Sequence, residues 1–154
     1  MNYLKIRQAT LADLPKLLEF EQGIIATERP FNPTLKDGSI NYYDLGAFIL
    51  SDDAEVVVAE LAGEVIASGY AQVRKAQDYL QHSVYAHLGA MFVQAAHRGK
   101  GINAEIIHTL IAWAKTRGIT EFRLEVYSDN LPAQKAYEKL GFQAHLLEMR
   151  LGIA

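Results

Sequence analysis

Cysteine is absent from the sequence, which excludes disulfide bonds, a thiolate nucleophile and cysteine-ligated metal sites together. This absence suits a reducing compartment. The sequence also lacks a signal-peptide pattern after Met1, and it has no apolar run near the roughly 18 residues that a membrane-spanning helix needs. We therefore expect a soluble, cytoplasmic protein without a membrane partner.

An excess of basic charge is missing as well, because 15 Lys and Arg residues stand against 18 Asp and Glu residues, for a net charge of −3. Nucleic acid and anionic surfaces are therefore not expected partners. The five histidines lack the spacing of metal ligands, so we predict no metal. Without repeats or linkers, the 154 residues are predicted to form a single domain, 1–154.

Apolar periodicity predicts that strands and helices alternate along the chain. The first helix follows Thr10 and Asp13, which match a capping box, and Gly118 and Gly141 are typical residues just after a helix. The predicted strands are residues 3–8, 54–61, 65–73, 84–94, 121–127 and 142–151, and the later helices are residues 100–117 and 131–140. This order predicts an α/β (α+β) fold with a mixed central β-sheet flanked by helices on both faces.

A glycine-containing turn joins the strand at 88–93 to the helix that follows it. Gly99 and Gly101 allow positive φ and close approach by a ligand, while Arg98 and Lys100 supply charges that pair with phosphate. The free N–H groups at the start of a helix favour an anion in the same place. An ordinary solvated turn is the alternative, because short glycine motifs are weak signals. The turn has neither the P-loop pattern nor the three-glycine dinucleotide pattern.

Two segments of the chain resemble the GNAT superfamily of acyl-CoA-dependent N-acyltransferases. The first is Arg98-Gly99-Lys100-Gly101-Ile102-Asn103, which fits the superfamily pattern except that Asn103 stands where a Gly or Ala is usual. The second segment contributes Asn130, Ala133, Ala136, Tyr137 and Gly141-Phe142. The resemblance is strong over residues 85–142 and diffuse before them.

The resemblance implies acetyl-CoA as the co-substrate, with its pyrophosphate on the turn that runs from Arg98 to Asn103. It also implies that the pantetheine arm lies along main-chain groups of Met91, Phe92 and Val93, and against a helix face formed by Asn130, Ala133 and Tyr137. Independently of the resemblance, Gly89 inside its strand indicates a bulge or a close approach by another chain segment.

Acyl transfer from a thioester to an amine needs a neutral amine, a stabilised oxyanion and a proton for the leaving thiolate. Tyr137 is the predicted acid, because a phenol is protonated at neutral pH; a packing role is the alternative. His87 is the candidate base, and Glu125 on the next strand is the alternative to it. A histidine in a strand is more often a hydrogen-bonded part of the scaffold.

The segment from Thr27 to Asp44 is rich in turn signals and is predicted to be an ordered loop that is either a connector or a substrate-binding lid. Glu28, Tyr42 and Tyr43, with Glu21 nearby, suit a cationic amine. Arg29 suits a substrate carboxylate. An amino acid, another small amine with an acidic group, or a peptide N-terminus would fit.

The sequence therefore predicts an N-acetyltransferase that moves an acetyl group from acetyl-CoA to a primary amine by direct transfer in a ternary complex. The alternative is a non-catalytic acyl-CoA-binding or regulatory module with the same fold. The retained Tyr137 beside Asn130 favours the enzyme. The acceptor is a small molecule or a peptide amine, and a homodimer is left open.

Overall fold

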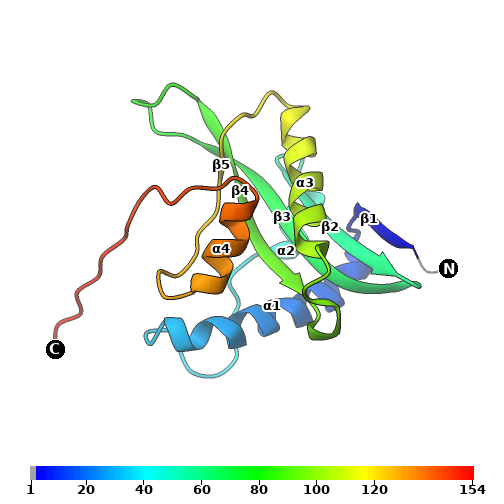
Figure 1. Ribbon diagram of the computed structural model, residues 1–154, viewed down its shortest axis with the longest axis horizontal. Helices are drawn as coiled ribbons and strands as arrows, with labels where there is room; N and C mark the ends of the chain where they lie inside the picture. The colour runs from blue at the N-terminus through cyan, green and yellow to red at the C-terminus, as the bar shows by residue number, and fades with distance from the viewer. Residues whose placement is uncertain (1–2) are drawn as a thin grey trace.

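A five-stranded sheet forms the centre of the computed structural model, which describes residues 3–154; Met1 and Asn2 of the predicted domain lie outside the described residues (Figure 1). The strands lie in the order β1 to β5. They are β1 Leu4–Gln8, β2 Ala54–Leu61, β3 Glu64–Lys75, β4 Val84–Val93 and β5 Phe122–Arg123. Neighbours from β1 to β4 are antiparallel, and β5 is parallel to β4. The predicted mixed sheet is confirmed.

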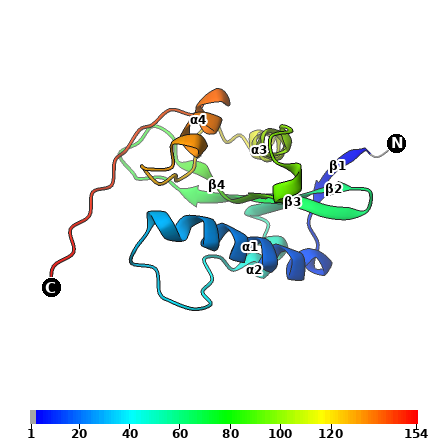
Figure 2. The ribbon, with the colours of Figure 1, turned by 60° about the horizontal axis from the view of Figure 1, so that its bottom comes forward.

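Helices cover both faces of this sheet, with α1 and α2 on one side and α3 and α4 on the other (Figure 2). They are α1 Leu14–Glu28, α2 Leu45–Leu50, α3 Ile102–Lys115 and α4 Leu131–Lys139. The capping box before α1 is present, because the Asp13 carboxylate accepts a hydrogen bond from the Thr10 N–H at 2.8 Å. Arg7 also pairs with Asp13 at 2.8 Å, which ties the start of α1 to β1.

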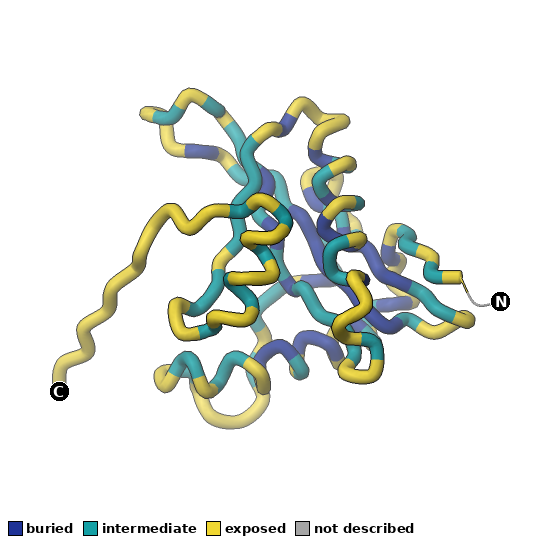
Figure 3. Tube along the Cα trace, in the orientation of Figure 1, coloured by how far each residue is buried: buried dark blue, intermediate teal, exposed yellow. Residues whose placement is uncertain are grey.

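The core consists of two apolar layers, one on each side of the sheet. Alternation along β2 sends Val57 and Ala59 toward α3, and Val56 and Val58 toward α1. The buried parts of the chain in Figure 3 follow the middle strands and the sheet-facing sides of α1 and α3. Among residues 3–154, no helix is long and apolar enough to cross a membrane.

The predicted strand over residues 142–151 is wrong. From Phe142 to Ala154 the described chain forms no strand and extends away from the body of the molecule, almost entirely exposed (Figures 1 and 3). The alternating pattern is present, but a strand also needs a hydrogen-bonding neighbour, and within residues 3–154 the tail has none. The strand predicted over 121–127 is likewise shorter, because only Phe122 and Arg123 pair with β4.

Candidate functional site

The two parallel strands β4 and β5 separate soon after they meet. They pair only through Ala86 with Phe122 and His87 with Arg123, while β4 continues to Val93. Beyond His87, the edge of β4 that faces β5 therefore has no strand partner among the described residues. Met91, Phe92 and Val93 lie along this stretch. Those of their main-chain groups that pair neither with β3 nor with another side chain can bond to an extended ligand; the Val93 carbonyl already accepts from Arg98.

A bulge in β4 lies at the level where the strands separate. Tyr70 of β3 is opposite Gly89 and Ser68 is opposite Phe92, so Gly69 faces both Ala90 and Met91. Ala90 has a positive φ of 53°, which is uncommon for a residue other than glycine. The bulge that Gly89 predicted is therefore present one residue further on.

The Tyr70 side chain of β3 covers the Gly89 position, which leaves no room for a side chain there. A Cβ added there would come within 2.5 Å of the Tyr70 hydroxyl oxygen, so the Tyr70 ring fills the space that a side chain would need. On the next residues the alternation shifts by one: Ala90 packs with the α1 layer and Met91 with the α3 layer. The bulge thereby changes which main-chain groups point into the gap between β4 and β5.

The glycine turn lies between the end of β4 and the start of α3. Gly99 and Gly101 have φ of 77° and 78°, and Gly101 is the N-cap of α3 without a side-chain cap. Arg98, Lys100 and both glycines are exposed. Arg98 is anchored, because its Nε donates to the Val93 carbonyl at 2.9 Å. The turn therefore presents uncapped helix N–H groups together with two basic side chains, which is what an anion needs.

Tyr137 lies on α4 over the α3 layer of the core. Burial raises the pKa of its hydroxyl, and the nearby Asn103 side chain opposes that shift. The phenol is therefore protonated at neutral pH, as a proton donor must be. Asn103, the departure from the superfamily pattern, thus has its side chain beside Tyr137 rather than only at the phosphate turn. Asn130 caps α4, since its side-chain oxygen accepts from the Ala133 N–H at 3.3 Å.

His87 lies on β4 opposite Gln72 of β3. Burial, together with the positive charge of Arg74, lowers its pKa to about 4. The imidazole is therefore neutral at pH 7 and has a free lone pair, although so low a pKa makes it a weak base. Glu125 is exposed just beyond β5. Burial raises the pKa of Tyr70 to about 12, a shift to which the Glu125 charge adds. The choice between the two bases remains a prediction.

Glu28 ends α1 and faces the same region as Tyr137. Burial raises the pKa of its carboxyl above the usual value, and the hydrogen bond from the neighbouring Tyr42 hydroxyl offsets part of that rise. Its charge also contributes to the raised pKa values of Tyr43 and Tyr137, both of which are raised mainly by burial. Glu28 is thus close to the predicted acid as well as to the predicted acceptor-binding tyrosines. The end of α1 and α4, which the sequence analysis treated separately, therefore lie near each other.

A row of rings leads from Tyr42 to His87 across this face of the sheet. The ring centroids are 5.6 Å apart for Tyr42 and Tyr43, 5.3 Å for Tyr43 and Tyr70, and 6.1 Å for Tyr70 and His87. The loop that carries Tyr42 and Tyr43 therefore packs on the sheet beside the bulge.

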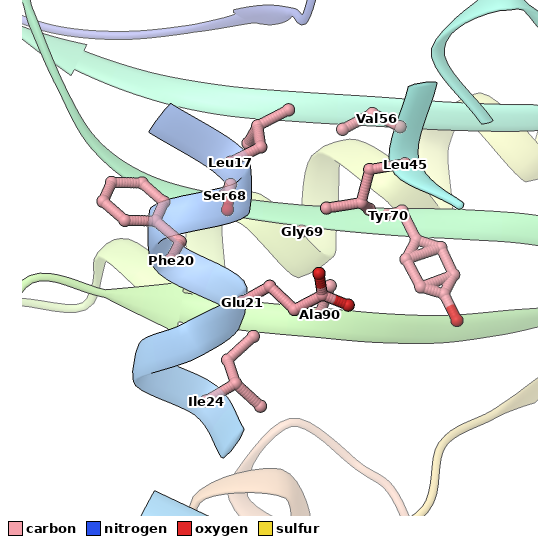
Figure 4. A pocket seen from close by; sticks show the side chains of 10 residues that line it. All are labelled: Leu17, Phe20, Glu21, Ile24, Leu45, Val56, Ser68, Gly69, Tyr70 and Ala90. Carbon is pink, nitrogen blue, oxygen red and sulfur yellow. The ribbon is translucent and has the colours of Figure 1, made fainter. Parts of the chain in front are cut away.

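Glu21 of α1 anchors that loop through hydrogen bonds to its main chain, a role that the sequence analysis missed. It is only 1% exposed, and its Oε2 accepts the main-chain N–H groups of Tyr42 at 2.7 Å and Tyr43 at 2.8 Å. Its Oε1 has no hydrogen-bond partner among residues 3–154 and lies at a cavity of about 10 Å³, the size of one water molecule (Figure 4). The signal in the sequence was an acid at a core-facing position of α1, between Leu17, Phe20 and Ile24.

Arg29 contacts the loop rather than an open site. Its two terminal nitrogens donate to the carbonyls of Lys36 at 2.9 Å and Gly38 at 2.7 Å. The pairing of Arg29 with a substrate carboxylate stays a prediction. It would require the two guanidinium nitrogens to bond to the substrate as well as to the loop carbonyls. Within residues 3–154, no three His, Asp or Glu side chains gather in a way that would hold a metal ion.

Comparisons with known proteins find acetyltransferases among the proteins similar to this chain. YobR of Bacillus subtilis, an uncharacterized N-acetyltransferase, is 40% identical over 58 residues, which are 38% of this chain and 24% of that protein. The L-methionine sulfoximine/L-methionine sulfone acetyltransferase of Pseudomonas paraeruginosa is 27% identical over 143 residues, 90% of this chain and 79% of that protein. The chain thus spans about a quarter of the first relative and most of the second.

Two solved structures share the fold. The mutant BH1408 protein of Bacillus halodurans has a TM-score of 0.87 at 18% identity, covering 97% of this chain and 99% of that one. A predicted acetyltransferase from Clostridium acetobutylicum, solved with acetyl-CoA, has a TM-score of 0.71 at 18% identity, covering 97% and 96%. The model of the acetyltransferase (GNAT) family matches residues 22–142, from the middle of α1 to three residues past the end of α4. This chain therefore belongs to the GNAT acetyltransferase family.

Proposed function

We propose that this chain is an N-acetyltransferase that moves the acetyl group of acetyl-CoA directly to a primary amine. The observation that supports it most is the convergence of three features on one site. The open edge of β4, the uncapped start of α3 and the protonated Tyr137 lie around the same gap. Family membership and the acetyltransferase relatives support the same reaction.

The residues at the gap fit acetyl-CoA. Gly99 and Gly101 have positive φ and open space around them, so the N–H groups at the start of α3 are accessible to a pyrophosphate. Arg98 and Lys100 add charge there. Main-chain groups from Met91 to Val93 would bind the pantetheine amides, and an N–H at the bulge would stabilise the oxyanion.

In the reaction, the amine nitrogen bonds to the thioester carbon and the carbon–sulfur bond breaks. Tyr137 donates its hydroxyl proton to the departing thiolate, and the amine loses a proton to His87 or Glu125, directly or through water. Glu28 lies near Tyr137 and would attract a cationic amine before it is deprotonated. The chain has no cysteine, so no acyl-cysteine intermediate forms.

The acceptor carries an acidic group in this proposal, and Arg74 binds it. Arg74 is partly buried on β3, its Nε donates to the Gln72 side chain at 3.0 Å, and no carboxylate of the described residues pairs with it. Its charge acts on both His87 and Tyr70, so it borders the row of rings. A guanidinium with free donors beside the predicted base suits a substrate carboxylate. The sulfoximine and sulfone named for the Pseudomonas relative are amino acids, which agrees with this class.

A panel of amines tests the proposed reaction. The protein is incubated with acetyl-CoA and each amine while free thiol is followed, and each amino acid is paired with its decarboxylated amine. We expect thiol release with at least one primary amine. Tight CoA binding by calorimetry without thiol release from any amine would instead favour the non-catalytic acyl-CoA-binding module.

Replacing Arg74 by glutamine is expected to raise KM for acidic acceptors about 10- to 100-fold, because a charge-assisted pair is lost. The decarboxylated partners should be almost unaffected. Arg123→Gln is the matched control, since that guanidinium already lies 3.6 Å from Glu121. An equal effect of Arg74→Gln on both members of a pair would remove Arg74 from acceptor recognition and leave the transfer reaction standing.

A further inference from the structure

A carboxylate is buried in the apolar layer between α1 and the sheet. Glu21 is 1% exposed. The other buried residues around it on this side of α1 are Leu17, Phe20 and Ile24. Burying a carboxylate costs free energy unless hydrogen bonds compensate for the lost water. Packing alone therefore does not explain an acid at this position, and the contacts of its two oxygens indicate what it does.

One oxygen of Glu21 binds two successive main-chain N–H groups. Its Oε2 accepts from Tyr42 at 2.7 Å and from Tyr43 at 2.8 Å. Successive N–H groups that converge on one anion form a concave nest, so the orientation of the peptide is fixed together with its position. Hydrogen bonds to a carboxylate are also roughly twice as strong as those between neutral groups. Glu21 therefore fixes the backbone at the two tyrosines that are predicted to contact the acceptor.

The next residue of α1 holds the same loop at a second point. The Gln22 side chain donates to the Ile40 carbonyl at 2.8 Å. Residues 40–43, here called the acceptor loop, belong to no helix or strand, so contacts with α1 must supply the order that a regular element would give. Gln22 is exposed whereas Glu21 is shielded from water, which makes the Glu21 contact the stronger of the two.

The side chain of Tyr43 connects the acceptor loop to the β4 bulge. Its ring centroid lies 5.3 Å from that of Tyr70. Burial raises the pKa of its hydroxyl, and a hydrogen bond from the main chain of Ala90 offsets part of that rise. Ala90 is the bulge residue with positive φ. Tyr43 is thus fixed at both ends, because its backbone is bonded to α1 and its hydroxyl to the strand segment beside the proposed thioester site.

We propose that Glu21 is a positioning residue for the acceptor amine, because it fixes the main chain of Tyr42 and Tyr43 and so holds their rings beside the β4 bulge. This inference rests on the proposed transfer reaction. Glu21 lies beneath the acceptor loop and is too buried to touch a substrate itself (Figure 4). Within residues 3–154 its hydrogen bonds go to the acceptor loop, so its loss should weaken acceptor binding and leave acetyl-CoA binding unchanged.

Amide hydrogen exchange tests the anchor without any substrate. In the wild type, the Tyr42 and Tyr43 amides should be protected although they lie outside helices and strands. Methionine is close to glutamate in shape but is only a weak acceptor, so Glu21→Met should speed exchange of these two amides about 10- to 100-fold. The amides of β2 should be unaffected. Unprotected amides in the wild type, or protection that survives Glu21→Met, overturns the proposal whether or not the protein is an enzyme.

Steady-state kinetics test the role in acceptor binding, with the amine of the panel that is acetylated fastest. Glu21→Met should raise KM for this acceptor about 10- to 100-fold, while kcat and KM for acetyl-CoA stay within about threefold. Glu21→Gln should stay near wild type, because its amide oxygen can replace Oε2 and Oε1 has no hydrogen-bond partner to lose among residues 3–154. Equal effects of the two variants, or a lower kcat with unchanged acceptor KM, contradict the proposal.

Asp13→Leu is the matched control for Glu21→Met. Asp13 is also a buried carboxylate, 8% exposed at the start of α1, and it accepts the Thr10 N–H at 2.8 Å. Its loss should lower the midpoint of urea unfolding and leave the acceptor KM unchanged. A similar rise in acceptor KM in both variants would make Glu21 a residue of stability alone. Thiol release from no amine would overturn the proposed function, and with it the role in acceptor binding, even where exchange showed the loop to be anchored.

Discussion

Replacing Tyr137 by phenylalanine is expected to lower kcat by about one to three orders of magnitude, with the fold and most CoA affinity kept. The change removes one hydroxyl and leaves the ring, which packs on the α3 layer and lies 6.1 Å from the Phe142 ring. Residual activity should stay measurable, because positioning of the reactants contributes more to the rate than one general acid does.

The pKa of Tyr137 adds a pH criterion to this test. Burial raises it above the ordinary value of 10, so the hydroxyl stays protonated further into the alkaline range than a free tyrosine does. The decline of kcat that belongs to this acid should therefore lie at higher pH than for an unperturbed tyrosine in the wild type and be missing in Tyr137→Phe.

Tyr127→Phe is the matched control for Tyr137→Phe. It also removes a tyrosine hydroxyl near the gap, but that hydroxyl is bonded to Asn32 at 2.9 Å. An acyl donor with a better leaving group should recover part of the loss in Tyr137→Phe if protonation of the thiolate limits the rate. Wild-type turnover by Tyr137→Phe with acetyl-CoA would make Tyr137 a packing residue and leave thiolate protonation to water or another group.

Local patterns in the sequence were sufficient for the parts of the fold that depend on neighbouring residues. β2 begins and ends at the predicted residues, and Gly118 and Gly141 have φ of 77° and 100° just after α3 and α4. Gly99 and Gly101 adopt positive φ as the turn required. In each case the backbone conformation is determined within a few residues, so the sequence carries its signal locally.

The parts that could not be predicted depend on contacts between distant segments. Arg29 and Arg74 are equally basic in the sequence, and only the fold shows that Arg29 is bonded to loop carbonyls while Arg74 borders His87. The Glu21 contact with the main chain at Tyr42 crosses 21 positions. The tail shows the same limit, because its alternation predicts a strand, and only the fold shows that no described segment pairs with it.

Replacing Gly101 by valine is expected to weaken CoA binding at least about tenfold, and up to about a thousandfold, as measured by calorimetry. Gly101 is the N-cap of α3 with φ of 78°, a conformation that a β-branched residue adopts only with strain. Its Cβ has open space in the structure, so the effect arises from the backbone and from the volume that a pyrophosphate would occupy. Loss of one or two charge-assisted N–H bonds accounts for the range.

Gly118→Val separates that effect from a general loss of stability. Gly118 lies at the other end of α3 with φ of 77° and likewise has no atom within 4 Å of an added Cβ. The free energy of unfolding, measured in urea, should fall by about 1 to 3 kcal/mol in both variants, because each places a branched side chain at positive φ. Only Gly101→Val should lose CoA affinity, since Gly118 is at the opposite end of the helix, where carbonyl groups rather than N–H groups are free. Equal CoA affinity in the two variants would place the pyrophosphate away from the start of α3, and Arg98 and Lys100 would then be solvated charges on an ordinary turn.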